Sequence, residues 1–199
     1  MIKVLSPLEG YNLWARTYHT EDNPIKTMSD DFILSEIKEG RLLDAGCGTG
    51  KLLQKGKQFT KGIDLSPAMI EEARKNCPNA TLVCADLSRA IIEENFYDVV
   101  ICGLVLGHIE NVEPVLVKLA NALKMGGKII LTDFHPYQSM MKAKRTFKYE
   151  SKVFEVKHSI HKLDEYFMIL KRAGVEIRTF KEPLFQGKPV IFGIAGVKC

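Results

Sequence analysis

The stretch 42-LLDAGCGTGKLL-53 decides the fold, because a short apolar run breaks there into three glycines within five residues. The apolar run predicts a buried strand, and the residues after the glycines favour the start of a helix. Glycine lets a backbone approach a ligand with no Cβ in the way and permits positive φ. Such a loop after a strand is typical of a site for a nucleotide-like ligand.

Segments that are strand-like alternate with helix-like ones on both sides of this loop. Helical spacing of apolar residues, capping residues and terminal glycines predict the helices. Short apolar runs predict the strands, and the last two follow each other so closely that we expect them to be antiparallel. The predicted helices include Tyr11 to Tyr18, 30–40, 66–76, a segment from Leu116 to Leu123 and one from Leu163 to Leu170; the predicted strands are 41–45, 59–64, 80–86, 96–102, 127–132, 175–180 and 189–198.

This alternation predicts an α/β fold. We expect a three-layer Rossmann-like sandwich, with a seven-stranded, mostly parallel sheet whose last strand is antiparallel. Ligands of such sheets bind beyond the carboxyl ends of the strands, which is where the glycine loop lies. Residues 134–160 show no clear pattern and are expected to be irregular, aromatic and basic.

Length and composition favour a single domain over 1–199. Hydrophobic residues make up 46% and charged residues 26% of the chain, as in ordinary globular domains. No apolar run has the ~18–20 residues that a membrane helix needs, and the five cysteines form no CxxC pair. We therefore expect a cytoplasmic protein with no membrane partner and no bound metal.

Positive charge is concentrated in 142–157, a segment that contains six Lys or Arg residues and only two Glu residues. This excess of four equals the formal net charge of +4 for the whole chain. A solvated basic face explains it more simply than a binding site does.

Three kinds of ligand compete for the glycine loop. A triphosphate loop reads GxxxxGK[ST], and this chain has Ala45 and Leu52 at two of the required positions. A dinucleotide loop reads GxGxxG, and Lys51 stands in place of the third glycine. The spacing present is GxGxG, preceded by Asp44.

The pattern 44-DAGCGTG-50 resembles the first motif of the class I S-adenosylmethionine-dependent methyltransferases. Four later stretches resemble further motifs of this family in the same order: GIDLSPAMI at 62–70, CADL at 84–87, FYDVVICGLVLGHI at 96–109 and LKMGGKIILTDFHP at 123–136. The resemblance covers roughly 8–197 and implies an enzyme that uses S-adenosylmethionine and releases S-adenosylhomocysteine.

The resemblance also implies which residues bind this cofactor. Asp64 is expected to accept both ribose hydroxyls, since a carboxylate has two oxygens that can take parallel hydrogen bonds. Nicotinamide enzymes use the same device, so Asp64 alone does not exclude them. Asp86 is expected at the adenine amino group, and the Leu87 amide at the ring. The implied cofactor-binding residues are Tyr18, Asp44, Gly46, Cys47, Gly48, Gly50, Asp64, Leu65, Met69, Asp86, Leu87, Cys102, Gly103 and Leu104.

Two segments are expected on the substrate side. Tyr11, Trp14 and Tyr18 resemble the Y-x-x-W-A-x-x-Y pattern of an N-terminal lid, which we place at 1–28, and 134–160 is a substrate-side insertion. The same aromatic spacing also fits plain core packing. The connection from Gly50 to Asp64 is shorter than the family usually has, which predicts a truncated first helix.

Methyl transfer by in-line displacement is the reaction that the resemblance implies. The protein then has to align the acceptor and exclude water, and a base helps when the acceptor carries a proton. His108 and His135 follow the fourth and fifth strands and are the candidate catalytic residues, because histidine titrates near neutral pH. Packing or cofactor contact is the alternative role for each.

The acceptor is expected to be a small molecule, and the basic insertion favours an anionic one. The chain has CGLV at 102–105 where methylases of nucleic-acid amino groups have [DNS]PP[YF], so a nucleic-acid partner is not expected. We expect a monomer or homodimer. Alternatives are an RNA or protein methyltransferase that uses 142–157, a non-catalytic S-adenosylmethionine-binding protein, and a nicotinamide-dependent oxidoreductase, which Lys51 disfavours.

Overall fold

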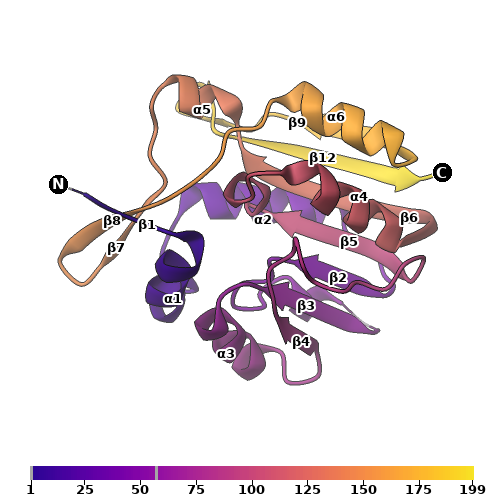
Figure 1. Ribbon diagram of the computed structural model, residues 1–199, viewed down its shortest axis with the longest axis horizontal. Coiled ribbons are helices and arrows are strands. Elements are labelled where there is room, and N and C mark those ends of the chain that lie inside the picture. The colour runs from indigo at the N-terminus through magenta and orange to yellow at the C-terminus, as the bar shows by residue number, and fades with distance from the viewer. Residues whose placement is uncertain (1, 57) are drawn as a thin grey trace.

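A seven-stranded sheet forms the centre of the protein, as a computed structural model that describes residues 2–56 and 58–199 shows (Figure 1). The strand order is β4-β3-β2-β5-β6-β12-β9. β12 is antiparallel to both of its neighbours, and the other pairs in the sheet are parallel, which confirms the predicted sheet. The strands are β2 (Leu42–Ala45), β3 (Thr60–Asp64), β4 (Thr81–Cys84), β5 (Tyr97–Gly103), β6 (Leu123–Phe134), β9 (Val175–Lys181) and β12 (Ile191–Lys198).

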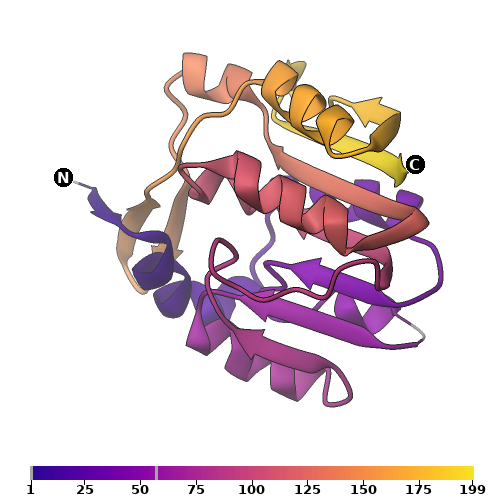
Figure 2. The ribbon, with the colours of Figure 1, turned by 45° about the vertical axis from the view of Figure 1, so that its right-hand side comes forward.

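Helices cover both faces of this sheet, which completes the three layers (Figure 2). On one face, α4 (Val112–Ala122) and α6 (Leu163–Arg172) pack their apolar stripes onto the strands. On the other face lie α2 (Pro24–Glu36) and α3 (Pro67–Asn76). No helix within the described residues is both long and apolar enough to cross a membrane.

The residues between β2 and β3 that the structure describes contain no full helix. They form a 3-10 turn, η1 (Leu53–Lys55), as the short spacing predicts. Leu53 is buried and fills the space beneath the turn, so the core is complete without a longer helix. A second 3-10 turn, η2 (Leu106–His108), follows β5.

A second, three-stranded sheet lies at one side of the molecule (left in Figure 1). It has the order β1-β8-β7 and is packed against α1; we call these four elements the small lobe. Their bounds are β1 (Lys3–Leu5), α1 (Pro7–Tyr18), β7 (Thr146–Tyr149) and β8 (Lys152–Val156). Leu5, Trp14, Phe147 and Val156 form its core, in which the Trp14 and Phe147 rings stack with centroids 4.7 Å apart.

The insertion is therefore more regular than the sequence indicated. Residues 134–160 contain α5 (Pro136–Met140) and the β7–β8 hairpin, so the expectation of an irregular segment is wrong. The third strand of the small sheet is β1, whose Lys3 pairs with Phe154. That pairing joins distant parts of the chain, and no local pattern reports it. A short hairpin of β10 (Leu184–Phe185) and β11 (Lys188–Pro189) lies between β9 and β12.

Local signals fix where α1 begins and where it docks. Ser6 and Glu9 form a capping box, in which the Ser6 amide donates to Glu9 Oε2 at 2.9 Å, and Pro7 occupies the first turn. Asn12 Oδ1 accepts hydrogen bonds from Ser66 Oγ at 2.6 Å and from the Ala68 amide at 3.3 Å. These bonds hold α1 across the start of α3, beside the carboxyl ends of the strands.

Candidate active site

A cavity of about 390 Å³ lies at the carboxyl ends of β2, β3, β4 and β5. Two aromatic residues of α1 help to line it. Residues of one 3-10 turn, η2, and of the loops after the strands line it as well. The sequence-predicted residues in its wall are Tyr18, Gly46, Gly48, Asp64, Leu65, Met69, Asp86, Leu87, Gly103, Leu104 and His108. The structure thus brings most of the predicted site to one place.

The glycine loop reaches the cavity with its backbone. Gly46 has φ +90°, and a Cβ there would lie 2.1 Å from Val105 Cγ2. Only glycine fits this position, because a side chain would be both strained and in contact with the next loop. The Gly46 and Cys47 amides donate to Ile63 O at 2.7 and 3.0 Å, which fastens the loop to β3.

Asp64 ends β3 and links the glycine loop to α3. Its Oδ2 accepts a hydrogen bond from the Gly48 amide, and its Oδ1 accepts one from the Ser66 amide, both at 2.8 Å. Burial raises the pKa of Asp64, while these backbone donors act in the opposite direction. The carboxylate is therefore held rigidly in the cavity wall, with the remaining lone pairs of its oxygens available to a ligand.

Asp86 follows β4 and stands in the wall of the same cavity as Asp64. Its Oδ1 accepts hydrogen bonds from the Ser88 amide at 2.8 Å and the Ser88 hydroxyl at 2.7 Å. No residue in the described part of the chain donates to its Oδ2. The two acids that the sequence placed at the ends of successive strands thus face one space, with Leu87 beside them.

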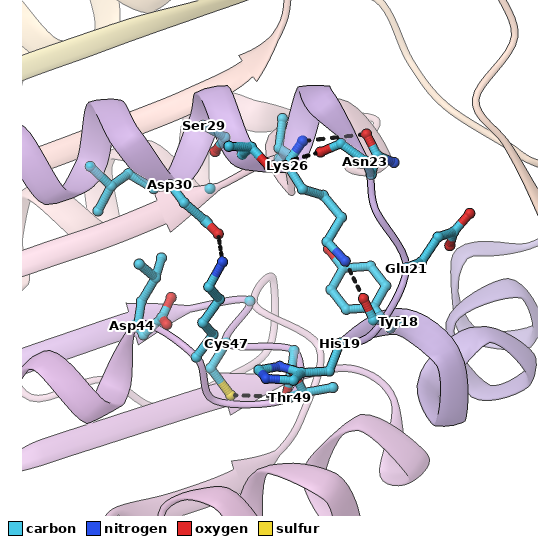
Figure 3. Close-up of a pocket in the computed structure, with 18 of the residues that line it drawn as sticks. Tyr18, His19, Glu21, Asn23, Lys26, Ser29, Asp30, Asp44, Cys47 and Thr49 are labelled. Atoms are coloured by element: carbon cyan, nitrogen blue, oxygen red, sulfur yellow. Dashed lines mark hydrogen bonds and ion pairs between the residues drawn. The ribbon is translucent and has the colours of Figure 1, made fainter.

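A smaller cavity of about 120 Å³ adjoins the first, and Figure 3 shows the residues that line it. The two share Tyr18, Gly46, Gly48, Gly103 and Leu104 in their walls. Its wall is rich in charged and polar side chains. These come mainly from the glycine loop and from α2 with the segment before it (Figure 3).

Asp44 and Lys26 are an acid and a cation in the wall of the smaller cavity, which also contains Glu21, Asp22, Asp30 and Lys51. Asp44 is buried, and burial together with the negative charges of Asp64 and Asp30 raises its pKa to about 8. Lys26 Nζ donates to Tyr18 O and lies 3.8 Å from the centre of the Tyr18 ring. Burial lowers the Lys26 pKa. Lys26 lies in the first turn of α2 and belongs to no motif, so its place in the cavity wall could not be predicted from the sequence.

His108 and Tyr11 form a hydrogen-bonded pair in the wall of the larger cavity. His108 Nε2 lies 2.9 Å from the Tyr11 hydroxyl, and His108 Nδ1 lies 3.0 Å from Lys157 O. Because a carbonyl only accepts, Nδ1 carries the proton and Nε2 accepts from Tyr11. Burial and the positive charge of Arg145 lower the His108 pKa to about 4. Burial raises the pKa of Tyr11, so both side chains are neutral near pH 7.

Besides Asp44, four predicted residues lie outside the wall of the larger cavity. Cys47 lines the smaller cavity, and Gly50 packs against α3, where a Cβ would lie 3.0 Å from Cys77 Sγ. Cys102 is fully buried in the core beneath the site. His135 lies outside both cavities, because its Nδ1 caps α5 by accepting from the Tyr137 amide at 3.1 Å and its Nε2 pairs with Glu182 at 2.8 Å. The structure therefore does not bring His135 to the site.

No group of three or more metal-ligating side chains occurs among the residues that the structure describes. Asp64 and Asp86 in the larger cavity each already accept backbone hydrogen bonds, and the third acid in its wall, Glu110, pairs with Lys157 at 3.0 Å.

Known proteins resemble this chain in sequence and fold. Residues 43–131 match the model of a family described as "Methyltransferase domain". The malonyl-[acyl-carrier protein] O-methyltransferase of Bacillus cereus is 33% identical over 107 residues, which are 50% of this chain and 39% of that protein. The chain spans about half the length, or less, of the curated relatives that it matches first.

Solved structures show the same fold. An S-adenosylmethionine-dependent methyltransferase from Clostridium acetobutylicum superposes with a TM-score of 0.70 at 19% identity, over 94% of this chain and 96% of that one. The magnesium protoporphyrin IX methyltransferase of Synechocystis, solved with bound S-adenosylhomocysteine, gives 0.65 at 20% identity, over 96% and 94%. Residues 43–131 thus match a methyltransferase domain family, and the chain as a whole has the fold of these S-adenosylmethionine-dependent and protoporphyrin methyltransferases.

Proposed function

We propose that S-adenosylmethionine binds across both cavities and that its methyl group is transferred to the hydroxyl of a small-molecule acceptor. One observation carries this proposal: the two cavities meet at the glycine loop, and each has the chemistry of one end of this cofactor. The larger one has two acids at the ends of successive strands, Asp64 and Asp86, and the smaller one contains both acids and lysines.

The larger cavity suits adenosine. Asp64 can accept the two ribose hydroxyls, and Asp86 Oδ2 can accept from the adenine amino group. The Leu87 amide has no partner among the described residues and can donate to the adenine ring. A dinucleotide fits less well, since its pyrophosphate would meet the Asp64 carboxylate at the loop, where like charges repel.

The smaller cavity suits the amino-acid end. Lys26 can pair with the carboxylate, and Asp44 can pair with the ammonium group (Figure 3). An ammonium group beside Asp44 favours its ionised form, so binding is expected to lower the raised pKa of this acid. The smaller cavity thus offers a partner for each charge of such a ligand.

Tyr11 and His108 are proposed to receive the proton that the acceptor loses. The cofactor supplies the electrophilic methyl group, and its sulfur keeps the electron pair of the broken bond. As the new bond to the acceptor oxygen forms, the acceptor proton passes to the Tyr11 oxygen and the Tyr11 proton passes to His108 Nε2. The Lys157 carbonyl then holds the Nδ1 proton of the imidazolium.

This pair favours a hydroxyl acceptor over an amine. A base with a pKa of about 4 cannot deprotonate an ammonium ion at pH 7, but it can take a proton from a hydroxyl that becomes acidic during the transfer. Two of the curated relatives are named as O-methyltransferases of malonyl-[acyl-carrier protein] and of ubiquinone biosynthesis, which agrees with oxygen as the methylated atom. The small lobe, with its basic 142–157 segment, is proposed as the lid over the acceptor.

Calorimetry with S-adenosylhomocysteine, S-adenosylmethionine and NAD tests the cofactor. We expect the first two to bind and NAD not to bind; the reverse overturns the proposal. Methyl transfer from labelled S-adenosylmethionine is then measured with a panel of small hydroxyl and amine compounds, and with RNA. Cofactor binding with no methyl transfer to any of these acceptors points to a non-catalytic protein. Methyl transfer to RNA, with an RNA affinity that falls steeply as the salt concentration rises, points to an RNA methyltransferase.

Tyr11→Phe and His108→Asn test the proton path. Each is expected to lower kcat by about 100-fold, the usual contribution of a general base, and to leave the affinity for S-adenosylhomocysteine within about threefold. Unchanged kcat in both variants contradicts the role of the pair.

A further inference from the structure

The turn 86–90 carries the two groups proposed to contact adenine, and its conformation is held from outside the cofactor cavity. Inside the turn, Asp86 O accepts from the Arg89 and Ala90 amides at 2.9 and 2.8 Å. Ser88 occupies Asp86 Oδ1 with its amide and its hydroxyl. These bonds leave Asp86 Oδ2 as the free acceptor and the Leu87 amide as the free donor.

Lys118 of α4 makes the external connection. Its Nζ donates to Leu87 O at 2.9 Å, Ser88 O at 3.1 Å and Ala90 O at 3.0 Å. An ammonium group has three donors, and all three are used on this one turn. No side-chain carboxylate of the described residues pairs with Lys118, so the turn takes the whole of its hydrogen-bonding capacity.

The support beneath Lys118 is rigid. Leu116 and Leu119 on either side of it are fully buried in the main core. Leu87 and Ala90 are buried in the same core, on the turn itself. The ammonium group therefore joins two elements that cannot slide past each other, and it fixes the carbonyl of the residue whose amide faces the ligand.

We infer that Lys118 is a positioning residue for adenine recognition. This inference rests on the proposed binding of S-adenosylmethionine. By holding three carbonyls of the 86–90 turn, it keeps the Asp86 Oδ2 acceptor and the Leu87 amide donor at the spacing of the adenine amino group and the neighbouring ring nitrogen. Hypoxanthine presents the opposite pattern, an acceptor followed by a donor. Lys118 thus helps to set the selectivity for adenine without touching the base.

The selectivity is measured with S-adenosylhomocysteine and its inosine counterpart, S-inosylhomocysteine. Calorimetry gives the ratio of their dissociation constants for the wild type, for Lys118→Met and for Lys124→Met. Lys124 is a matched control, because its ammonium group pairs with Asp98 at 2.9 Å and has no contact with the turn. The ratio compares two ligands on one protein, so a lower folded fraction in a variant cancels out.

We expect the wild type to prefer the adenosine ligand by about 100-fold, since two mismatched hydrogen bonds cost about tenfold each. Lys118→Met is expected to reduce this preference to about tenfold, and Lys124→Met to leave it unchanged. A ratio in Lys118→Met within threefold of the wild type overturns the inference, as does an equal loss in Lys124→Met. Failure of the wild type to bind S-adenosylhomocysteine overturns the proposed function instead.

Discussion

The two sides of the candidate site are built in opposite ways. The cofactor side comes from consecutive strands, in which a short motif after each strand supplies the residues of the wall, as Asp64 and Asp86 illustrate. The small lobe joins chain segments from the beginning and from the last third of the sequence, since β1 pairs with β8. The comparison teaches that local backbone geometry governs the cofactor side, whereas long-range packing governs the lobe.

Gly46→Ala is expected to have the largest effect, because it changes the backbone geometry of the cofactor side directly. The new Cβ would meet Val105 Cγ2 at 2.1 Å in a residue whose φ is +90°. We expect a loss of about 3 kcal/mol or more in the free energy of unfolding and loss of S-adenosylhomocysteine binding. Denaturant unfolding and calorimetry measure both.

Gly187→Ala is the matched control for this variant. Gly187 has φ +75°, but no atom lies within 4 Å of the position of its added Cβ. The free energy of unfolding should fall by only about 1 kcal/mol, which is the cost of the left-handed conformation for a residue with a Cβ, and the ligand affinity should not change. Equal losses in the two variants would show that close packing at the loop is unimportant.

Phe147→Ala tests whether the small lobe has its own stability. Phe147 is buried against Trp14, and removing its ring should cost the lobe about 3 kcal/mol. We expect hydrogen exchange to become faster at the β1 and β8 amides and to stay unchanged in β2 and β5. Thr146→Ala, an exposed neighbour on the same strand, should change neither. Faster exchange throughout the main sheet would mean that the lobe and the sheet unfold together.

This contrast explains how far the sequence could be interpreted. The mostly parallel sheet with its antiparallel last strand, the short connection after Gly50 and the meeting of Asp64 with Asp86 follow from local patterns along the chain, whereas the strand order does not. The pairing of Tyr11 with His108 joins residues 97 positions apart, and Lys26 belongs to no motif, so neither was predictable. His135 was misplaced for the same reason, since its partner Glu182 comes from beyond α6.

Asp44→Asn is expected to have the smallest effect, and it sharpens the comparison at the cofactor side. The pKa of Asp44 is about 8 in the folded, ligand-free protein and about 3.9 in an unfolded chain. Between these values the unfolded state releases its proton first, so this acid lowers stability as the pH rises. Asn cannot titrate, and the variant should therefore gain about 1 kcal/mol over the wild type between pH 5 and pH 6, since one pKa unit is worth about 1.4 kcal/mol. Urea unfolding at both pH values measures the difference.

The same substitution should weaken binding of S-adenosylhomocysteine at pH 8, because the ammonium group of the ligand loses its carboxylate partner. If the variant is more stable but binds the ligand less tightly, Asp44 contributes to ligand binding and lowers the free energy of unfolding measured without ligand. The core of the small lobe is formed instead by the apolar or aromatic side chains of Leu5, Trp14, Phe147 and Val156. A stability difference that does not change with pH would contradict the raised pKa and leave Asp44 as an ordinary buried residue.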